Sequence, residues 1–214
     1  FRAASPNPDV DSNEVRRQWE TRSGEYSPAY YAHYGPDETS ETLRTTFERF
    51  LGPDAAILEL GCGSGRHLAH LHEHGFGPLS GIDLNGDSFD VMAETYPDLA
   101  GEGTFHHGAI EDVVEGFEDR RFDAVYSVET LQHIHPDVEW VFEEVARITD
   151  GVLVTVENEG EADISRSAPT EVNYVTDDVP LYYRNWRHVF DRLGFVEVDA
   201  ERGKRDTVRT FRRA

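Results

Sequence analysis

A predicted strand that runs into three alternate glycines, and then into a helix, is the feature that most constrains this chain. The segment is ILELGCGSGRH, residues 57–67, and its glycines are Gly61, Gly63 and Gly65. Glycine permits the unusual dihedral angles of a tight turn and lets the backbone come within contact distance of a ligand. A dinucleotide-binding fingerprint has its third glycine three positions after the second, where this chain has Arg66. The spacing therefore counts against NAD.

Two acidic residues accompany the glycine turn. Glu59 lies two positions before Gly61, on the same face of the strand end, where a carboxylate can take up the positive amino group of an amino-acid moiety. Asp83 ends the next predicted strand, where a carboxylate can accept hydrogen bonds from both hydroxyls of a ribose. Because an acid at that place serves NAD equally well, Asp83 alone does not discriminate between the two kinds of ligand.

Short strands and helices alternate along most of the chain. After an amphipathic helix over 39–51, the apolar pattern predicts strands over 55–60, 79–83, 103–108, 122–127, 151–157, 195–200 and 206–211. Further helices are predicted over 66–75, 88–96 (stopped by Pro97), 138–148 and 184–193. The acidic and polar residues 158–180 are interpreted as a long loop. The alternation predicts an α/β fold, in which a mostly parallel sheet has helices on both faces.

Four segments together resemble the class I S-adenosylmethionine-dependent methyltransferase family: ILELGCGSG, GIDLN, HHGAIEDV and FDAVYSVETLQHI. The resemblance covers residues 40–211 and implies a Rossmann-like, seven-stranded sheet whose last strand is antiparallel and lies beside the sixth. It implies S-adenosylmethionine as cofactor and S-adenosylhomocysteine as product. Residues 39–214 would form the methyltransferase domain, and residues 1–38 an N-terminal tail and helical lid.

The resemblance also implies roles for individual residues. Glu59 and the glycine turn would hold the methionine part of the cofactor, Asp83 its ribose, and Leu84 one face of its adenine. Ile110 would offer its backbone to the adenine edge, and the carbonyl of Ser127 would contact the methionine amino group. With Tyr26 as the lid residue that touches the cofactor, the expected binding set is Tyr26, Glu59, Gly61, Cys62, Gly63, Gly65, Asp83, Leu84, Ile110 and Ser127.

The chain departs from the family pattern at one position. Many members carry an aspartate where this chain has Ala109, which puts the recognition of adenine by a side chain in question. Asp112, three positions further along, is instead a candidate cap for the helix that follows.

Histidines occur at two places that bear on chemistry. His133 and His135 follow the fourth strand, at the carboxyl edge of the sheet, where ligands bind in open α/β folds. His133 matches a histidine frequent in the family and is the candidate general base, with packing or capping as the alternative. His67, His70 and His74 share one helix face without a matching acid or cysteine cluster, so we interpret them as a solvated face and expect no metal site.

Aromatic residues are concentrated in two further segments. In similar enzymes the N-terminal segment and the loop after the fifth strand cover the cofactor and build the acceptor pocket. The aromatic residues expected to flank the ligand edge here are Trp19, Tyr26, Tyr30, Tyr31, Tyr174, Tyr182, Tyr183 and Trp186. The alternative is that they only pack the N-terminal helix onto the domain.

The chain is strongly acidic. It has 42 acidic and 20 basic residues, a formal net charge of -22, and Lys204 as its single lysine. Such a surface repels polyanions and disfavours nucleic acid as a partner. The composition favours a halophilic archaeon, whose salty cytoplasm screens self-repulsion, over an ordinary acidic mesophile.

Cysteine use and hydropathy bound the location of the protein. Cys62 is the only cysteine, which excludes an intrachain disulfide. No apolar stretch has the length of a membrane helix, and the polar residues 1–12 are interpreted as a tail without a signal peptide's apolar core. We therefore expect a soluble, cytoplasmic protein with no membrane contact.

The sequence leaves the methyl acceptor open. A small molecule, methylated at oxygen or nitrogen, is preferred because the added elements are aromatic rather than basic. The first alternative is a tRNA or protein methyltransferase, supported only by the basic C-terminal cluster Arg202, Lys204, Arg205, Arg209, Arg212 and Arg213. The second is a catalytically silent S-adenosylmethionine-binding module. The oligomeric state is left undetermined.

Overall fold

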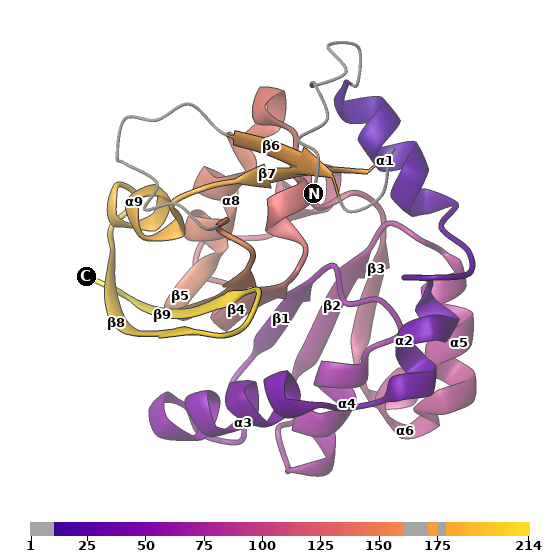
Figure 1. Ribbon diagram of the computed structural model, residues 1–214. Helices are drawn as coiled ribbons and strands as arrows, with labels where there is room; N and C mark the ends of the chain where they lie inside the picture. Colours follow the sequence, from indigo (N-terminus) through magenta and orange to yellow (C-terminus); the bar gives the residue numbers. More distant parts are fainter. Residues whose placement is uncertain (1–10, 161–170, 175–178) are drawn as a thin grey trace.

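A computed structural model describes residues 11–160, 171–174 and 179–214. Within them, seven strands form one sheet in the order β3-β2-β1-β4-β5-β9-β8 (Figure 1). β1 to β5 pair in parallel, and β9 is antiparallel to both β5 and β8. The bounds are β1 Ile57–Leu60, β2 Leu79–Asp83, β3 Thr104–His107, β4 Phe122–Val128, β5 Thr149–Glu157, β8 Phe195–Arg202 and β9 Thr207–Arg213. The predicted seven-stranded sheet with an antiparallel last strand is confirmed.

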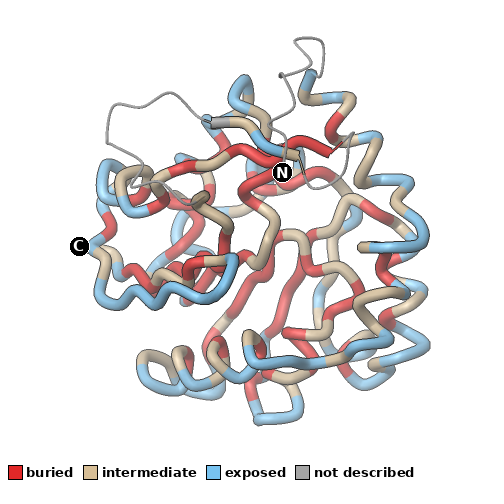
Figure 2. The backbone as a smooth tube through the Cα atoms, in the orientation of Figure 1, coloured by how far each residue is buried: buried red, intermediate tan, exposed pale blue. Residues whose placement is uncertain are grey.

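Helices cover both faces of the sheet because the central strands are apolar on both sides. Leu58 packs in a core with residues of α7, α8 and α9, whereas its neighbour Ile57 packs in a second core with residues of α3, α4, α5 and α6. Buried residues accordingly follow the central strands, and exposed ones the outer helices (Figure 2). The helices are α3 Glu38–Phe50, α4 Arg66–Glu73, α5 Asp87–Thr95, α6 Pro97–Glu102, α7 Ile110–Val114, α8 Val141–Ile148 and α9 Trp186–Asp191.

The N-terminal region folds into two further helices, α1 (Ser12–Glu20) and α2 (Pro28–Tyr34). Each begins at a residue whose side chain accepts a hydrogen bond from the first turn: Asp11 from Glu14 N and Ser27 from Tyr30 N. In Figure 1, α1 and the small ribbon formed by β6 (Glu171–Tyr174) and β7 (Pro180–Tyr183) lie at the same end of the molecule. This end carries the cavity described below.

The structure corrects the predicted elements in two places. Pro97 does end α5, but it also begins α6, because proline is well suited to the first turn of a helix. Part of the predicted loop 158–180 is a strand: β6 (Glu171–Tyr174) pairs antiparallel with β7 (Pro180–Tyr183). Residues 161–170 and 175–178 of that loop, and nearly all of the predicted tail 1–12, lie outside the described residues.

Two short 3-10 turns follow β4: η1 (Leu131–His133) and η2 (Pro136–Val138). None of the helices in the described ranges has both the length and the apolar character needed to cross a membrane.

Candidate functional site

A cavity of about 190 Å³ opens at the carboxyl ends of β1, β2 and β4, beneath α1 and α2. This volume exceeds the roughly 10–15 Å³ that one water needs, so the cavity has room for a ligand. His133 and eight of the ten predicted cofactor residues line it: Tyr26, Glu59, Gly61, Cys62, Gly63, Asp83, Leu84 and Ile110. Gly65 and Ser127 do not.

The three glycines of the turn all have positive φ, but each has a different structural role. A Cβ on Gly61 would lie 2.3 Å from Thr130 Oγ1, so this glycine lets β1 and β4 end in close contact. A Cβ on Gly65 would lie 2.8 Å from Met92 Cε, so Gly65 serves the packing of α4 on α5. A Cβ on Gly63, at φ +52°, meets no atom within 4 Å and would point into open space. Gly63 is thus the glycine that leaves room for a ligand.

Asp83 ties the glycine turn to the end of β2. Its Oδ2 accepts a hydrogen bond from Gly63 N (2.7 Å), and its Oδ1 accepts from Asn85 N (2.8 Å) and Ser88 Oγ (3.0 Å). Burial raises the pKa of Asp83, and these donors oppose that shift. A carboxylate offers about four acceptor positions, so one remains for a ligand hydroxyl.

Glu59 is a second buried carboxyl group in the cavity wall, with 2% of its surface exposed. The hydroxyl of Tyr126 donates to its Oε2 at 2.9 Å. Burial raises the pKa of Glu59 well above its usual value, because the charged form loses its hydration. A cationic ligand group beside it would restore the charged form.

Two further polar groups of the wall lack a partner among the described residues. One is the hydroxyl of Ser64, in the glycine turn, with 1% of the residue exposed; the other is Nε1 of Trp19, in α1. A buried polar group without a hydrogen bond is costly, so both indicate that a polar ligand completes the site.

A buried carboxylate that the sequence analysis missed holds η1. Glu157, the last residue of β5, accepts hydrogen bonds from the backbone N–H groups of Thr130 (3.3 Å), Leu131 (3.1 Å) and Gln132 (3.1 Å). The hydroxyl of Ser127 also donates to it. Burial raises the pKa of Glu157 to about 7. Its sequence signal was an acid ending an apolar strand, as at Asp83.

A buried guanidinium holds the other end of η1. Arg184, 4% exposed, donates to the carbonyls of Leu131 (3.5 Å) and Ile134 (2.6 Å) and pairs with Glu139 at 2.8 Å. The turn that carries His133 is therefore held by an acidic side chain that accepts from its backbone N–H groups and by a guanidinium that donates to its backbone carbonyls.

His133 is buried, and its tautomer follows from its contacts. Nδ1 lies 2.9 Å from the carbonyl of Pro180 in β7, and because a carbonyl only accepts, Nδ1 carries the proton. Burial lowers the pKa of His133 to about 4, so the ring is neutral at pH 7, and its unprotonated Nε2 accepts a hydrogen bond from Gln132 Nε2 at 3.4 Å. The ring packs against Trp19, with centroids 4.7 Å apart.

The N-terminal helix α1 is fastened over the cavity by polar contacts. Arg16 pairs with Glu111 at 2.8 Å and with Asp112 at 3.2 Å. Asn85 Nδ2 donates to the carbonyls of Trp19 (3.4 Å) and Arg22 (3.2 Å). Asp112 is therefore an ion-pair partner, and its predicted role as a helix cap is wrong: α7 begins at Ile110, and its N-cap residue, Ala109, provides no side-chain cap.

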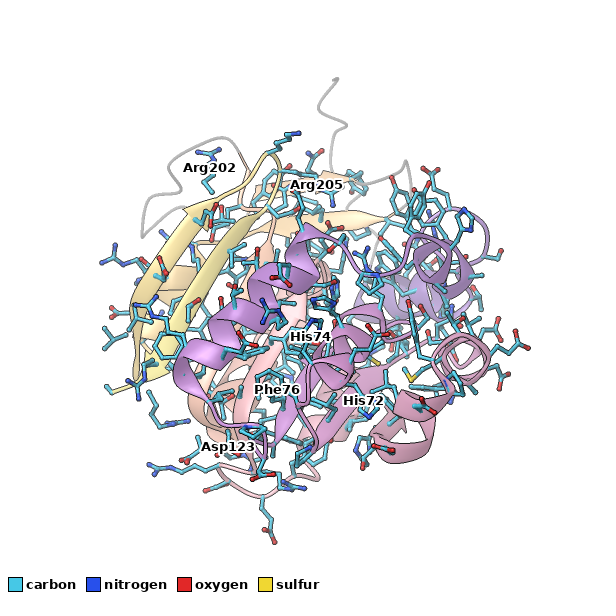
Figure 3. All side chains as sticks on the ribbon, turned by 90° about the horizontal axis from the view of Figure 1, so that it is seen from below. His72, His74, Phe76, Asp123, Arg202 and Arg205 are labelled. Carbon is cyan, nitrogen blue, oxygen red and sulfur yellow. The ribbon has the colours of Figure 1, made fainter. Side chains whose placement is uncertain are left out.

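Two other predictions are corrected. His67 is buried and 2.8 Å from Ser40 Oγ, with its pKa lowered to about 3 by burial. Of the three histidines predicted to share a solvated face, His70 and His74 alone lie toward the surface (Figure 3 labels His74). Trp186 is fully buried against Phe142 in the core rather than at the ligand edge. Within the described ranges, no group of three metal-ligating side chains is present.

The second aromatic segment lies behind the site rather than in it. In the described residues, Tyr174, Tyr182 and Tyr183 are not in the cavity wall; Tyr182 packs on His135, with ring centroids 5.5 Å apart. Of the N-terminal rings, Trp19, Tyr26 and Tyr31 line the cavity and Tyr30 packs behind Tyr31.

Comparisons with known proteins bear on this site. Residues 57–150 match the family model described as "Methyltransferase domain". A dTDP-3-amino-3,6-dideoxy-alpha-D-glucopyranose N,N-dimethyltransferase of Streptomyces fradiae is 37% identical over 71 residues, 33% of this chain and 25% of that protein. Phosphoethanolamine N-methyltransferase 2 of Caenorhabditis elegans is 26% identical over 155 residues, 70% of this chain and 34% of that protein. The chain thus spans a quarter to a third of these relatives' length.

A solved structure matches nearly the whole chain. The Burkholderia thailandensis 1,6-didemethyltoxoflavin-N1-methyltransferase, with bound 1,6-didemethyltoxoflavin and S-adenosylhomocysteine, has a TM-score of 0.75 and 17% identity. The match covers 99% of this chain and 94% of that one. At this identity the likeness establishes the shared fold.

Proposed function

Because residues 57–150 match a methyltransferase domain, a family that uses S-adenosylmethionine, we propose that this chain transfers a methyl group from S-adenosylmethionine to a small-molecule acceptor. The observation that carries the proposal is the single cavity that brings together the glycine turn, Glu59, Asp83 and the aromatic N-terminal helices. We further propose that residues 1–38 are an N-terminal tail and lid segment and residues 39–214 the methyltransferase domain, in a halophilic archaeal cytoplasm.

The cofactor residues are proposed from their geometry. Gly63 leaves open space for the methionine part of the cofactor. The oxygen of Glu59 that Tyr126 does not contact binds the α-amino group, and the remaining acceptor position of Asp83 binds a ribose hydroxyl. Leu84 and Ile110 supply apolar walls for the adenine. Ser127 remains in the proposed set only through its backbone, since its side chain is bonded to Glu157.

S-adenosylmethionine supplies a methyl group that is already activated on a sulfonium centre. The chain's own residues then have to orient the acceptor, exclude water and accept a proton where the acceptor carries one. The lid contacts of Arg16 and Trp19 exclude water, and the unprotonated Nε2 of His133 is the proposed proton acceptor. A pKa of about 4 keeps Nε2 unprotonated at neutral pH but makes it a weak base, and the Gln132 amide has to move away from Nε2 before it can accept a proton.

A small molecule is proposed over tRNA or protein because the basic C-terminal cluster is largely occupied. Arg205 pairs with Glu129 and Asp206, Arg209 pairs with two glutamates, and Arg213 donates to backbone carbonyls. The names of the two curated relatives described above and of the solved structure describe methylation at nitrogen in small molecules, whereas a third curated relative, of Pyrenophora dematioidea, is an O-methyltransferase. The absence of nucleic-acid binding stays a prediction.

Calorimetry tests the proposal without a known acceptor. S-adenosylhomocysteine should bind at one site per chain and NAD should not. Gly63→Val should abolish this binding, because the side chain fills the open space. Gly75→Val is the matched control, since Gly75 also has positive φ (+88°) with no atom within 4 Å of a Cβ but lies outside the cavity. Tight NAD binding, or binding by a folded Gly63→Val variant equal to that of the control, would refute the proposal.

A further inference from the structure

The part of the cavity beyond the cofactor residues contains a carboxylate that the proposed function does not use. Glu129 directly follows β4 and lines the cavity, with 28% of its side chain exposed. It adjoins Thr130, whose side chain touches the position of a Gly61 Cβ. Glu129 therefore lies beside the glycine turn, on the methionine side of the cavity, where methyl transfer takes place under the proposed function.

The backbone at Glu129 is held in a costly conformation. Its φ is +49°, and among the described non-glycine residues only Tyr26 and Arg120 share a positive φ. Glycine would adopt this conformation freely, whereas a side chain is strained there. The chain thus carries a carboxylate at position 129 although the backbone there would suit glycine better.

The charge around Glu129 is not fully neutralised. Its ion-pair partner, Arg205, is shared with Asp206 at 3.2 Å, so one guanidinium serves two carboxylates. Figure 3 shows Arg205 on the turn between β8 and β9, at the opposite end of the molecule from Asp123. Burial and the charge of Glu129 raise the pKa of Asp206 to about 6. The group formed by Glu129, Arg205 and Asp206 therefore has a net negative charge, and Glu129 brings that charge to the cavity wall, where it favours a cation.

Aromatic rings complete the surroundings of Glu129. Burial and, to a smaller extent, the Glu129 carboxylate raise the pKa of Tyr31, and Tyr31, Tyr26 and Trp19 all line the cavity. A carboxylate accepts N–H hydrogen bonds, and aromatic faces attract cationic nitrogen. The unpartnered Trp19 Nε1 and Ser64 hydroxyl independently indicate a polar ligand.

The cations near the cavity are engaged elsewhere. Arg66, which lies over Tyr31, pairs with Asp37 at 2.9 Å, and Arg16 pairs with Glu111. Arg22 packs over Trp19 and Tyr26, and its carbonyl accepts from Asn85, on the ribose side of the cavity. Arg205 is the cation beside Glu129, and it is shared with Asp206, so the described residues place no unpaired cation there to select an anionic acceptor over a cationic one.

Resting on the proposed function, we propose that the methyl acceptor is a primary or secondary amine whose nitrogen is bound by Glu129. The amine enters as an ammonium and releases one proton to solvent by way of His133 Nε2, the proton acceptor of the proposed function, which frees its lone pair. The lone pair forms the new N–C bond as the C–S bond breaks, and the bonding electrons stay on sulfur. The products are the methylated ammonium and S-adenosylhomocysteine. Glu129 orients the nitrogen by accepting an N–H that does not react.

Binding of matched probes tests this inference. With S-adenosylhomocysteine bound, the protein is titrated with benzylamine and benzyl alcohol, and with ethanolamine and ethylene glycol. The amine of each pair should bind at least tenfold more tightly. Glu129→Gln should reduce this preference at least tenfold while S-adenosylhomocysteine affinity is unchanged. Glu144→Gln is the matched control, because Glu144 is also paired with an arginine, is 24% exposed and lies on α8, away from the cavity.

A second variant guards against misfolding. Glu129→Gly removes the carboxylate but relieves the positive φ, so its melting temperature should not fall below that of Glu129→Gln, and its amine preference should be lost as well. If Glu129→Gln and Glu129→Gly both still bind the amine of each pair more tightly than the alcohol, the inference is overturned. Equal or undetectable binding of both members of each pair, with S-adenosylhomocysteine bound, also overturns it and leaves the proposed function standing. Failure to bind S-adenosylhomocysteine instead refutes the proposed function itself.

Discussion

Glu157 should make the stability of the fold depend on pH. The residue is fully buried, and its pKa is about 7 in the folded chain, against 4.5 for an unperturbed glutamate. A carboxyl group whose pKa is raised by folding stabilises the fold below the unfolded pKa, and this contribution is lost as the pH rises through the folded pKa. At about 1.4 kcal/mol per pKa unit, the loss between pH 4.5 and pH 8 is about 3 kcal/mol.

The variant Glu157→Gln isolates this contribution. Glutamine has nearly the shape of the protonated acid and cannot ionise, so its stability should lack the Glu157 part of the pH profile. Its NH₂ group cannot accept from Gln132 N, which costs about 1–3 kcal/mol at every pH. Relative to the wild type, the variant should therefore gain about 3 kcal/mol between pH 4.5 and pH 8.

Urea unfolding in molar potassium chloride at several pH values measures this difference. Because the other titrating groups are common to both proteins, their effects cancel in the comparison. Glu144→Gln, on the surface of α8, should run parallel to the wild type across the range. A free-energy difference between Glu157→Gln and the wild type that stays constant from pH 4.5 to pH 8 would show that burial does not perturb this carboxyl group.

Three further outcomes are expected. The melting temperature should rise steeply from low to molar potassium chloride, because salt screens the net charge of -22; a flat profile would refute the halophilic assignment. His133→Gln should lower turnover of an acceptor that needs deprotonation by roughly a hundredfold with little change in S-adenosylhomocysteine affinity, and normal turnover would assign His133 to packing. Asp83→Ala should weaken S-adenosylhomocysteine binding by about 1.5–3 kcal/mol in calorimetry, and unchanged affinity in a folded variant would remove Asp83 from the site.

The sequence predicted the sheet and the glycine turn because both are encoded locally. The run from Ile57 to His67 contains its own strand, turn and helix start, and the apolar runs identify every strand of the main sheet. Glu59 and Asp83 could be placed near the turn because each lies at the carboxyl end of a predicted strand. These features need no knowledge of which distant segments meet.

The acceptor side was harder to predict because distant segments build it. Glu157 holds residues 25 to 27 positions away, and Arg184 holds carbonyls 50 and 53 positions away. Composition also cannot distinguish an aromatic side chain of the core from one of the lid: Trp186 is buried in the core, whereas Trp19 lies in the cavity wall. His67 was misjudged because helical spacing alone does not reveal that α3 covers that face of α4.

The two halves of the site are therefore supported independently. The cofactor half depends on β1, β2 and the glycine turn, through Asp83 and its short contact to Gly63. The half that carries His133 depends on η1, whose two ends are held by Glu157 from β5 and Arg184 after β7. Because these supports share no residue, substitutions of Glu157 or Arg184 should change turnover more than cofactor affinity.

The lid joins the two halves, since Trp19 packs on His133 while its carbonyl is bound by Asn85 beside Asp83. Closing α1 over bound cofactor would thus also complete the wall around His133, which links acceptor binding to a filled cofactor site.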